Sequence, residues 1–528
     1  MKLQAFSINN WLYPDSVLTD VSHAVQLHSA RNADVCFQIL TDMTVPAGTA
    51  CSWEAKMPAG FRLTLLQLGA LNVPYNSGPN YHNTFDPEES KDFVTRRAPF
   101  DVFDMTRPID GVLQAGKAAF LVRIDVPADA AVGLCSGVLT ICVGDCSAAI
   151  EIGIQVHKPV LNAPKDSPYG MINWIYPEIL CRTHEVERGS EEYYDWYRKY
   201  FEEQIDMRNT HFQLPTGLTV KDAQGRIVDF DFSECERIGK LALEAGFRCI
   251  FGGFVAHWNH WKDASLVLVW DTEVFTDSME GSWQLRQYFR RLREMVERNG
   301  WQDVYMQGLV DEPQLYNTMS YRALTGLFRR EFPGLLIIDP VETPDIYGSC
   351  DIWVIKQAIY EKYREQYDRI REQGEEYWVY TCGFPAGKWM NRVLDLPLAA
   401  TRLPVWMGVR YGMVGFLHWG YHAYSAEMDP MKDVCYPVMH HGVRKYFPAG
   451  NHAIVYMDKD HIYESVRAHL QRISAEDGEL LLRLREVDES ACNGIIDSVC
   501  TGFEEYVSDP AAIDEAHKQL LEQLDKYC

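Results

Sequence analysis

The sequence predicts a multidomain chain: an N-terminal β-sandwich, then a (β/α)8 barrel of the TIM type, then a C-terminal helical segment packed on the barrel. Three observations support this prediction. Short β-type runs separated by turn residues fill residues 1–160, short apolar strands alternate with helical stretches over residues 165–450, and residues 451–528 contain two strongly helical stretches. At about 150 residues per domain, a chain of 528 residues also has room for three domains.

The N-terminal region is a succession of short apolar runs. We expect its strands at residues 34–40, 61–71, 117–127, 136–144 and 148–156. Short strands with Pro, Gly, Asp and Asn between them are typical of a β-sandwich. A long polar loop with aromatic residues spans 73–89, and loops of that length are uncommon unless they have a function. A linker with several prolines, residues 157–170, then leads to the barrel.

The central region alternates between strands and helices. The expected strands are 169–173, 211–217, 247–255, 304–313, 335–342, 351–356, 376–382 and 414–421. The expected helices are 190–208, 232–246, 282–300, 320–334, 358–374 and 396–412. Ser190 is placed to cap the first helix, and Gly246 and Gly300 to end the second and third. Eight strands in this alternation favour a closed barrel, with an irregularity at 343–350, where the connection is too short for a full helix.

The remaining segments complete the domain scheme. No glycine-rich phosphate-binding motif follows a strand, so a nucleotide-binding open sheet lacks its signature. Residues 461–487 and 509–528 form the two C-terminal helices. Acids and bases are mixed along both helices, and we expect these charges to face solvent.

Charge and cysteine use limit the partners and the compartment. The net charge is −24, from 50 Lys and Arg against 74 Asp and Glu, which disfavours nucleic acid and anionic membrane surfaces. The first residues have no apolar run typical of a secretory signal, and no stretch of about 18 apolar residues occurs. The 14 cysteines are scattered, so we expect free thiols in the reducing cytoplasm.

Barrel enzymes place their active sites at the carboxyl ends of the strands. The fourth strand ends in Asp311 and Glu312, followed by Pro313. Two neighbouring carboxyls in a partly dry site cannot both ionise freely, so one pKa rises and that residue can act as a general acid. Aromatic residues at the ends of other strands, drawn from 14 Trp, 28 Tyr and 23 Phe, indicate a pocket for a sugar.

Other chemistries have weaker signals. His257 and His260 form H-x-x-H without the glutamate of a metalloprotease motif, so we expect no metal. No G-x-S-x-G motif occurs, and Cys382 has no base identified near it, so serine and cysteine hydrolases are disfavoured. Paired carboxylates on opposite faces of a sugar usually come from different strands. Adjacent acids fit better a substrate that supplies its own 2-acetamido nucleophile.

Several segments resemble one enzyme family. They are GLVDEP (308–313), DIWVIK (351–356), EYWVYTCGFPAGKWMNRVLDLPLAATRLPVW (376–406) and GFLHWGYHAYS (415–425). They resemble glycoside hydrolase family 123 and its relatives known as domain of unknown function 4091. The resemblance implies a retaining, exo-acting β-N-acetylgalactosaminidase or hexosaminidase on a (β/α)8 barrel. It makes Glu312 the general acid/base, and it makes Asp311 the residue that orients the acetamido group and stabilises an oxazolinium intermediate.

Ten further residues are predicted to bind the sugar. Strand-end position singles out Trp174, Tyr176 and Trp258. The family motifs add Trp378, Tyr380, Asn391, Arg392, His418, Trp419 and Tyr421.

The leading interpretation is a cytoplasmic hydrolase of small oligosaccharides or glycosides that needs no cofactor. Two alternatives remain: a related barrel acting on a sugar without an acetamido group, and a catalytically inactive carbohydrate-binding protein. The sequence leaves open the linkage, the aglycone, the contribution of loop 73–89 and the oligomeric state, a homo-oligomer included.

Overall fold

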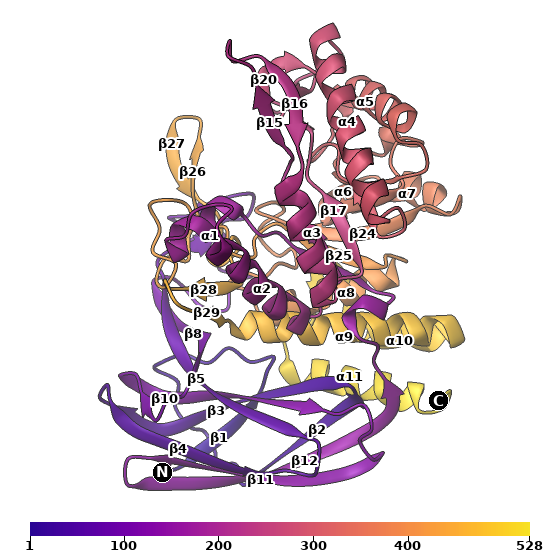
Figure 1. Ribbon diagram of the computed structural model, residues 1–528. Helices are drawn as coiled ribbons and strands as arrows, with labels where there is room; N and C mark the ends of the chain where they lie inside the picture. Colours follow the sequence, from indigo (N-terminus) through magenta and orange to yellow (C-terminus); the bar gives the residue numbers. More distant parts are fainter.

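The computed structural model describes residues 1–528, apart from the side chain of residue 87. Figure 1 shows three layers along the long direction of the molecule. Two β-sheets from the N-terminal region form one end, long C-terminal helices cross the middle, and the eight-stranded central sheet with its helices forms the other end.

The N-terminal region contains two five-stranded sheets. The first has the order β1 (Leu3–Ser7), β3 (Ala33–Val45), β10 (Gly116–Val126), β5 (Arg62–Val73), β8 (Phe100–Pro108). The second has the order β2 (Ala24–Arg31), β12 (Cys146–Val160), β11 (Gly133–Val143), β4 (Thr49–Lys56), β9 (Val112–Leu113). Phe37 and Phe120 of the first sheet share one buried apolar cluster with Ile141 and Ile152 of the second. This pair of sheets is compatible with the predicted sandwich.

The central sheet is an almost closed parallel barrel. Its strands are β13 (Gly170–Asn173), β14 (His211–Gln213), β17 (Cys249–Gly252), β21 (Tyr305–Gln307), β22 (Leu336–Val341), β23 (Ile352–Lys356), β24 (Glu376–Thr381) and β25 (Gly415–His418). Each strand from β14 onward pairs in parallel with the next, and β25 pairs with β13. The Thr210 amide donates to the Met171 carbonyl at 2.9 Å across the remaining gap. All eight predicted strands are therefore confirmed.

Helices follow most of the barrel strands. They are α1 (Pro177–His184), α2 (Glu191–Asp206), α3 (Ser233–Ala245), α4 (Met279–Asn299), α5 (Thr318–Glu331), α6 (Gln357–Lys362), α7 (Arg364–Arg371) and α8 (Ala399–Arg410). The Ser190 hydroxyl accepts the Tyr193 amide at the start of α2, and Gly246 and Gly300 end α3 and α4 in the left-handed conformation.

Two of these connections differ from a regular helix. The predicted helix 358–374 is two helices, because Tyr363 between them leaves helical geometry. The short 343–350 connection contains only a 3-10 turn, Pro344–Ile346, which confirms the predicted irregularity.

The C-terminal helices lie between the barrel and the N-terminal sheets (Figure 1). They are α9 (Val466–Val487), α10 (Glu489–Asp497) and α11 (Pro510–Leu524), with α9 packed on α8 and on strands β3 and β8. The prediction that the charges of both helices face solvent is wrong for α9, since Arg467, Arg472 and Asp477 are at most 1% exposed.

Ion pairs compensate for the burial of the charged side chains of α9. Arg467 pairs with Asp104 of β8 at 2.8 Å, and Asp477 pairs with Arg402 of α8 at 2.6 Å. A charge can be buried when an opposite charge and hydrogen bonds compensate its lost hydration. The helix therefore fastens the barrel to the N-terminal sheets through charges as well as through apolar packing.

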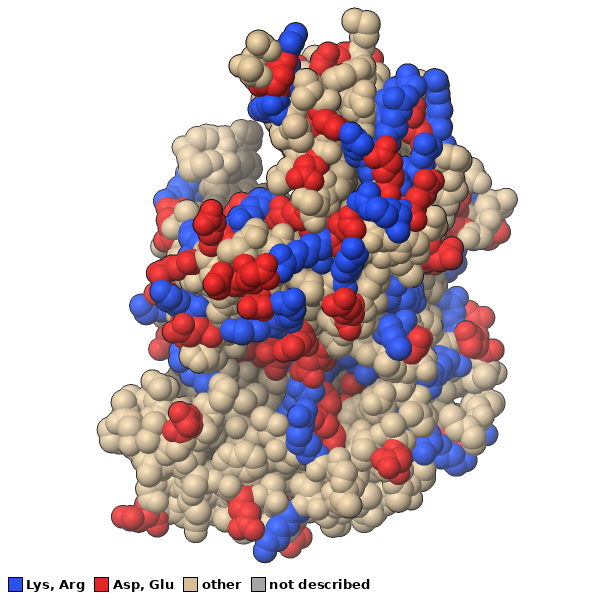
Figure 2. Space-filling model, viewed as in Figure 1, with Lys and Arg blue, Asp and Glu red and all other residues tan. Residues whose placement is uncertain are grey.

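Other large-scale features bear on the predicted partners. On the face shown in Figure 2, basic and acidic side chains alternate over the barrel helices, and the N-terminal sheets carry few charges. Within the described chain, the 14 cysteines are free thiols, as predicted. No helix among the described residues has both the length and the apolar character that a membrane span requires. The compartment, the domain bounds and the oligomeric state stay predictions.

Candidate active site

Asp311 and Glu312 lie in the loop that follows β21. A buried carboxylate, Asp339 of β22, holds this loop by accepting the amides of Leu309 and Val310 at 2.8 and 3.1 Å. Asp339 is completely buried, and its second oxygen accepts a hydroxyl hydrogen bond of 2.7 Å from helix α5. The neighbouring strand thus fixes where the acid pair leaves the barrel.

Glu312 has an unusual backbone. Its φ is +54°, in the left-handed region that non-glycine residues adopt at a cost of about 1–3 kcal/mol. Its amide donates to the Pro340 carbonyl at 3.1 Å, which compensates part of that cost. Such strain is retained where the surroundings determine the conformation, and here it turns the Glu312 side chain toward β23 and β24.

Three side chains surround the Glu312 carboxylate. The Tyr380 hydroxyl donates to its Oε1 at 2.5 Å, and Lys356 Nζ lies 2.9 Å from the same oxygen. Lys356 is 3% exposed and also pairs with Glu342 Oε1, and Tyr380 lies 3.2 Å from that atom. Glu342 follows β22, and its side chain is 7% exposed. The predicted pair is therefore part of a cluster of three acids and one lysine.

The pKa values within this cluster diverge. Burial and the neighbouring Glu312 raise the pKa of Asp311 to about 8, and burial raises the pKa of Glu342 to about 7. Burial also acts to raise the pKa of Glu312, but Lys356 and the Tyr380 hydrogen bond outweigh it and hold this pKa below its ordinary value. Burial acts to lower the pKa of Lys356, yet the carboxylates hold it well above its ordinary value. The unliganded cluster thus retains protons at neutral pH and keeps them away from Glu312.

Asp311 and Glu312 both line a cavity of about 190 Å³ at the carboxyl end of the barrel. The Asp311 carboxylate makes no hydrogen bond or ion pair with any side chain that the structure describes, so it is free to meet a ligand. The remaining lining residues are mostly aromatic or apolar: Tyr81, Trp174, Pro340, Tyr380, Cys382, Gly383, Leu417, Trp419 and Phe447. This combination of two acids and flat apolar walls suits a single sugar ring.

The structure brings only some of the predicted wall residues to the cavity. Trp174, Tyr380 and Trp419 line it, although the Tyr380 hydroxyl is already engaged by carboxylates. The indole N–H of Trp174 is buried and has no partner within the described structure, so it remains available to a ligand. The others do not line the cavity: Tyr176, Trp258, Trp378, Asn391, Arg392, His418 and Tyr421.

Four of these residues are buried inside the protein rather than exposed to the cavity. Trp378 is 1% exposed and packs in the barrel core, where a Cβ on Gly415 would lie 2.2 Å from its ring. Tyr421 and His418 are completely buried. Arg392 is also buried and donates to Asn173 Oδ1 at 2.6 Å.

Two of the other three residues donate to backbone carbonyls near the site, and the third packs on an aromatic ring. The Tyr176 hydroxyl donates to the Trp419 carbonyl at 3.0 Å, and the Asn391 amide donates to the Cys382 carbonyl at 2.7 Å. Trp258 packs edge-on against Trp261. Tyr176 and Asn391 thus hold the backbone of Trp419 and Cys382, two residues that line the cavity.

One wall comes from the N-terminal region, which the sequence left open. Tyr81 of loop 73–89 lines the cavity. The loop is anchored on the barrel residue Asp395, which accepts the Ser77 amide at 2.6 Å, the Ser77 hydroxyl at 2.8 Å and the Asn76 side chain at 3.1 Å. The unusual length of the loop was the sequence signal for this role.

Metal and thiol chemistry have no support in this geometry. No group of three or more His, Cys, Asp or Glu among the described residues is arranged to hold a metal ion. The His260 side chain is 87% exposed, and the His257 ring contacts the Trp258 carbonyl at 2.9 Å. Burial raises the pKa of the Cys382 thiol to about 12, so it is not a thiolate nucleophile at neutral pH.

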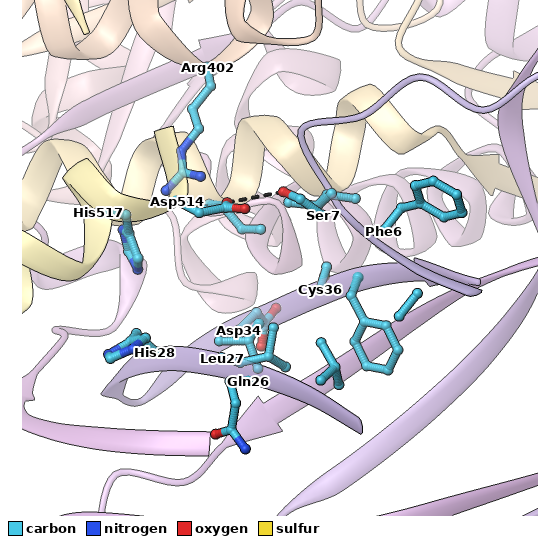
Figure 3. A pocket seen from close by; sticks show the side chains of 16 residues that line it. Phe6, Ser7, Gln26, Leu27, His28, Asp34, Cys36, Arg402, Asp514 and His517 are labelled. Atoms are coloured by element: carbon cyan, nitrogen blue, oxygen red, sulfur yellow. Dashed lines mark hydrogen bonds between the residues drawn. The ribbon is translucent and has the colours of Figure 1, made fainter. Parts of the chain in front are cut away.

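A second hollow, also of about 190 Å³, lies between α11 and the N-terminal sheets (Figure 3). Ser7 donates to Asp514 there at 3.0 Å, and His28 and His517 face the same space. It shares no described lining residue with the acid cavity and includes none of the predicted site residues. It marks the seam where the last helix meets the sheets.

Comparison with known proteins decides the family. The family model described as the glycoside hydrolase 123 catalytic domain matches residues 174–484, more than half of the chain. The chain belongs to glycoside hydrolase family 123. The matched segment of this family 123 chain contains Asp311, Glu312, Glu342, Lys356 and Tyr380, whereas loop 73–89 lies outside it. No curated protein sequence matches the chain.

Solved structures agree at the level of the fold. A family 123 glycoside hydrolase from Clostridium perfringens, studied for glycolipid glycan hydrolysis, matches with a TM-score of 0.75 at 13% identity, covering 100% of this chain and 98% of that one. A β-D-glucuronidase from Dictyoglomus thermophilum matches at 8% identity and a TM-score of 0.36, covering 90% and 97%. A Thermobacillus composti xylanase matches at 9% identity and 0.34, covering 59% and 98%. The first match shows that the fold of this family 123 chain is shared over its whole length, and the other two are too distant to support an argument.

Proposed function

We propose that the protein is an exo-acting, retaining β-N-acetylhexosaminidase that prefers N-acetylgalactosamine and uses the 2-acetamido group of its substrate as the nucleophile. The observation that carries the proposal is the distribution of carboxylates. Among the described residues that line the cavity, Asp311 and Glu312 are the only acids, and they come from one loop. A retaining enzyme without a carboxylate on the opposite face of the sugar needs its nucleophile from the substrate.

The first chemical step uses both acids. The acetamido carbonyl oxygen attacks the anomeric carbon and forms the oxazolinium ring as the glycosidic bond breaks. Glu312 gives its proton to the departing oxygen. Asp311, free in the cavity, accepts the acetamido N–H and stabilises the positive charge that develops on the ring. In the second step water attacks the anomeric carbon, Glu312 takes the proton of that water, and the acetamido group is released with net retention.

Substrate binding reconciles these roles with the pKa values of the unliganded protein. The free chain holds the proton on Asp311 rather than on Glu312. An amide N–H donated to Asp311 favours its ionised form, and an ionised Asp311 beside Glu312 raises the pKa of Glu312. The acetamido group thus raises the pKa of Glu312, the residue that must carry the catalytic proton, and a sugar without this group does not.

The cavity also supports an exo mode of action. Its volume of about 190 Å³ accommodates one sugar ring, and Trp174, Trp419 and Phe447 offer flat faces for stacking. The leaving group therefore extends outward past Glu312. The Clostridium perfringens relative was studied for glycolipid glycan hydrolysis, which makes glycolipid glycans a substrate class to test for this chain.

The test compares aryl β-N-acetylgalactosaminide, β-N-acetylglucosaminide and β-galactoside as substrates. We expect the first two to be hydrolysed and the galactoside to react at least ~10²-fold more slowly, because it has no internal nucleophile. Glu312→Gln should abolish release of poor leaving groups, and Asp311→Asn should lower the rate for every acetamido substrate. A galactoside cleaved as fast as the acetamido sugars would instead support the related barrel glycosidase. Binding of sugars without cleavage of any of them would support the inactive carbohydrate-binding protein.

A fluorinated series isolates the nucleophile. Replacing the acetyl hydrogens one by one with fluorine makes the carbonyl oxygen a poorer nucleophile while the sugar stays nearly the same size. We expect kcat/KM to fall at each step. A flat series would refute substrate assistance even if hydrolysis itself were observed.

A further inference from the structure

Glu342 and Glu312 are both held by the same two side chains, Lys356 and Tyr380. Lys356 Nζ contacts Oε1 of both carboxylates, at 2.9 Å for Glu312 and more closely for Glu342. The Tyr380 hydroxyl lies 2.5 Å from Glu312 Oε1 and 3.2 Å from Glu342 Oε1. One lysine charge is thus shared by two acids, and one hydroxyl bridges them.

We propose that Glu342 is a positioning residue that holds the catalytic proton of Glu312 and exchanges it through the Tyr380 hydroxyl. This inference rests on the proposed function of Glu312 as the general acid. It adds a third acid, a lysine and a tyrosine to the pair that the sequence singles out.

The exchange conserves charge and atoms. The protonated Glu342 carboxyl gives its proton to the Tyr380 oxygen while the Tyr380 O–H proton moves to Glu312 Oε1. Glu342 becomes a carboxylate paired with Lys356, and Glu312 becomes the neutral acid that the glycosidic oxygen requires. Lys356 keeps its charge in both states, and the one negative charge passes from Glu312 to Glu342, so the net charge of the buried site is unchanged.

The surroundings of Glu312 agree with this role. Asp311 faces it from its own loop, Lys356 from β23, Tyr380 and Cys382 from β24 and its end, and Tyr81 from the N-terminal loop. Lys356 is the cation in this set. A single lysine beside two nearby carboxylates compensates one of them, so the second is best accommodated with a proton. A hydrogen bond involving Glu342 is also among the causes that lower the pKa of Glu312, as expected when a protonated carboxyl faces a carboxylate.

The decisive variant is Glu342→Gln, which keeps the shape but cannot pass on a proton. Lys356 then neutralises Glu312 alone, so the pKa of Glu312 falls. We expect the basic limb of the kcat/KM profile to move about one pH unit or more toward acid. At neutral pH, an aryl glycoside with a poor leaving group should lose about 10²-fold, because it needs the general acid. A 2,4-dinitrophenyl glycoside should change by less than ~3-fold, because a good leaving group needs little protonation.

Two further variants separate this role from a loss of structure. Glu376→Gln makes the same change at the other end of β24, on an exposed residue that bonds the Trp378 indole at 2.9 Å, and should leave both substrates and the pH profile unchanged. Tyr380→Phe removes the bridging hydroxyl but keeps both ion pairs of Lys356, and should reproduce the dependence on the leaving group. An equal loss on both substrates with an unmoved pH profile, or no loss, would overturn the inference.

Infrared spectroscopy tests the shared proton without any turnover. The wild-type minus Glu342→Gln difference spectrum at neutral pH should contain the C=O band of a protonated carboxyl. Its absence refutes the inference. If the wild type cleaves none of the aryl glycosides, the proposed function has failed, while this band still decides whether Glu342 holds a proton.

Discussion

The anchor of the acid loop offers a sharp prediction. Asp339→Leu keeps the size of the side chain and removes the acceptor of the Leu309 and Val310 amides. Asp339→Asn keeps an acceptor oxygen at the same place. Burial raises the pKa of Asp339 well above its ordinary value, so burial penalises the negative charge that asparagine lacks.

The magnitudes follow from these contacts. A buried donor left without a partner costs about 1–3 kcal/mol, so two orphaned amides destabilise Asp339→Leu by about 2–6 kcal/mol. Without this anchor the Glu312 backbone can relax from its φ of +54°, and a displacement of about 1 Å at a catalytic group costs on the order of 10²-fold in rate. For Asp339→Asn we expect a loss of about 1 kcal/mol or less in the free energy of unfolding, which corresponds to a factor of about five in the ratio of folded to unfolded protein.

Two assays together check this reasoning. Urea unfolding gives the loss of stability, and kcat for an aryl β-N-acetylgalactosaminide is measured well below the unfolding transition of each variant. The expected order is wild type, then Asp339→Asn close behind, then Asp339→Leu far below in both assays. A folded Asp339→Leu with wild-type kcat would show that the loop needs no anchor, and equal losses for the two variants would show that charge rather than hydrogen bonding matters.

Three further changes test other parts of the structure. Gly415→Ala places a Cβ 2.2 Å from the Trp378 ring and should lower Tm. Gly494→Ala is the control, because a Cβ there meets nothing within 4 Å and should leave Tm unchanged. Equal melting temperatures for the two variants would contradict the close packing of Gly415 on the Trp378 ring. Asp477→Asn leaves the arginine of α8 without its carboxylate and should cost about 3–5 kcal/mol in urea unfolding at neutral pH. Burial acts to raise the pKa of Asp477, but this arginine and His517 lower it from 3.8 to about 2. The difference in free energy of unfolding between the wild type and Asp477→Asn should therefore shrink as pH falls from about 4 to 2. A difference that does not change with pH would refute this. Tyr81→Ala removes an aromatic wall and should raise KM roughly 2–10-fold with a smaller effect on kcat, and an unchanged KM would exclude contact with the sugar.

The barrel could be predicted because its signals are local. Each strand is a short apolar run, and glycines such as Gly246 and Gly300 end the helices between them in the left-handed conformation, at φ of +109° and +67°. Hairpins inserted in the connections, such as β15 (Leu218–Lys221) with β16 (Ile227–Asp231), escaped prediction because they are short and largely exposed. The burial of α9 also escaped, because a charged helix does not reveal in its own sequence that Asp104 and Arg402 will meet it.

The active site likewise contains features that the local sequence predicts and features that depend on contacts between distant segments. The Asp311–Glu312 pair stands out as two acids after an apolar strand, and the structure places both in one cavity. Trp378 lies two residues before Tyr380 on β24, so the two share a face, but only the later one reaches the carboxyl end of the barrel. The glycines that make room for the Trp378 ring come from other strands. Lys356 could be recognised as a strand end, but its two carboxylate partners come from different strands and become apparent only in three dimensions.

The cavity is therefore the product of both halves of the chain. The family model begins at residue 174, yet Tyr81 comes from a loop that three hydrogen bonds tie to Asp395. The barrel also depends on the N-terminal sheets for the charge that balances Arg467 on α9. A barrel cut free of residues 1–160 would lose one wall of the cavity and leave a buried guanidinium unpaired. The acids and their lysine are held at the carboxyl ends of the barrel strands, whereas loop 73–89 can change the wall without disturbing them. We therefore expect differences in substrate preference among family members to arise in this loop rather than around Glu312.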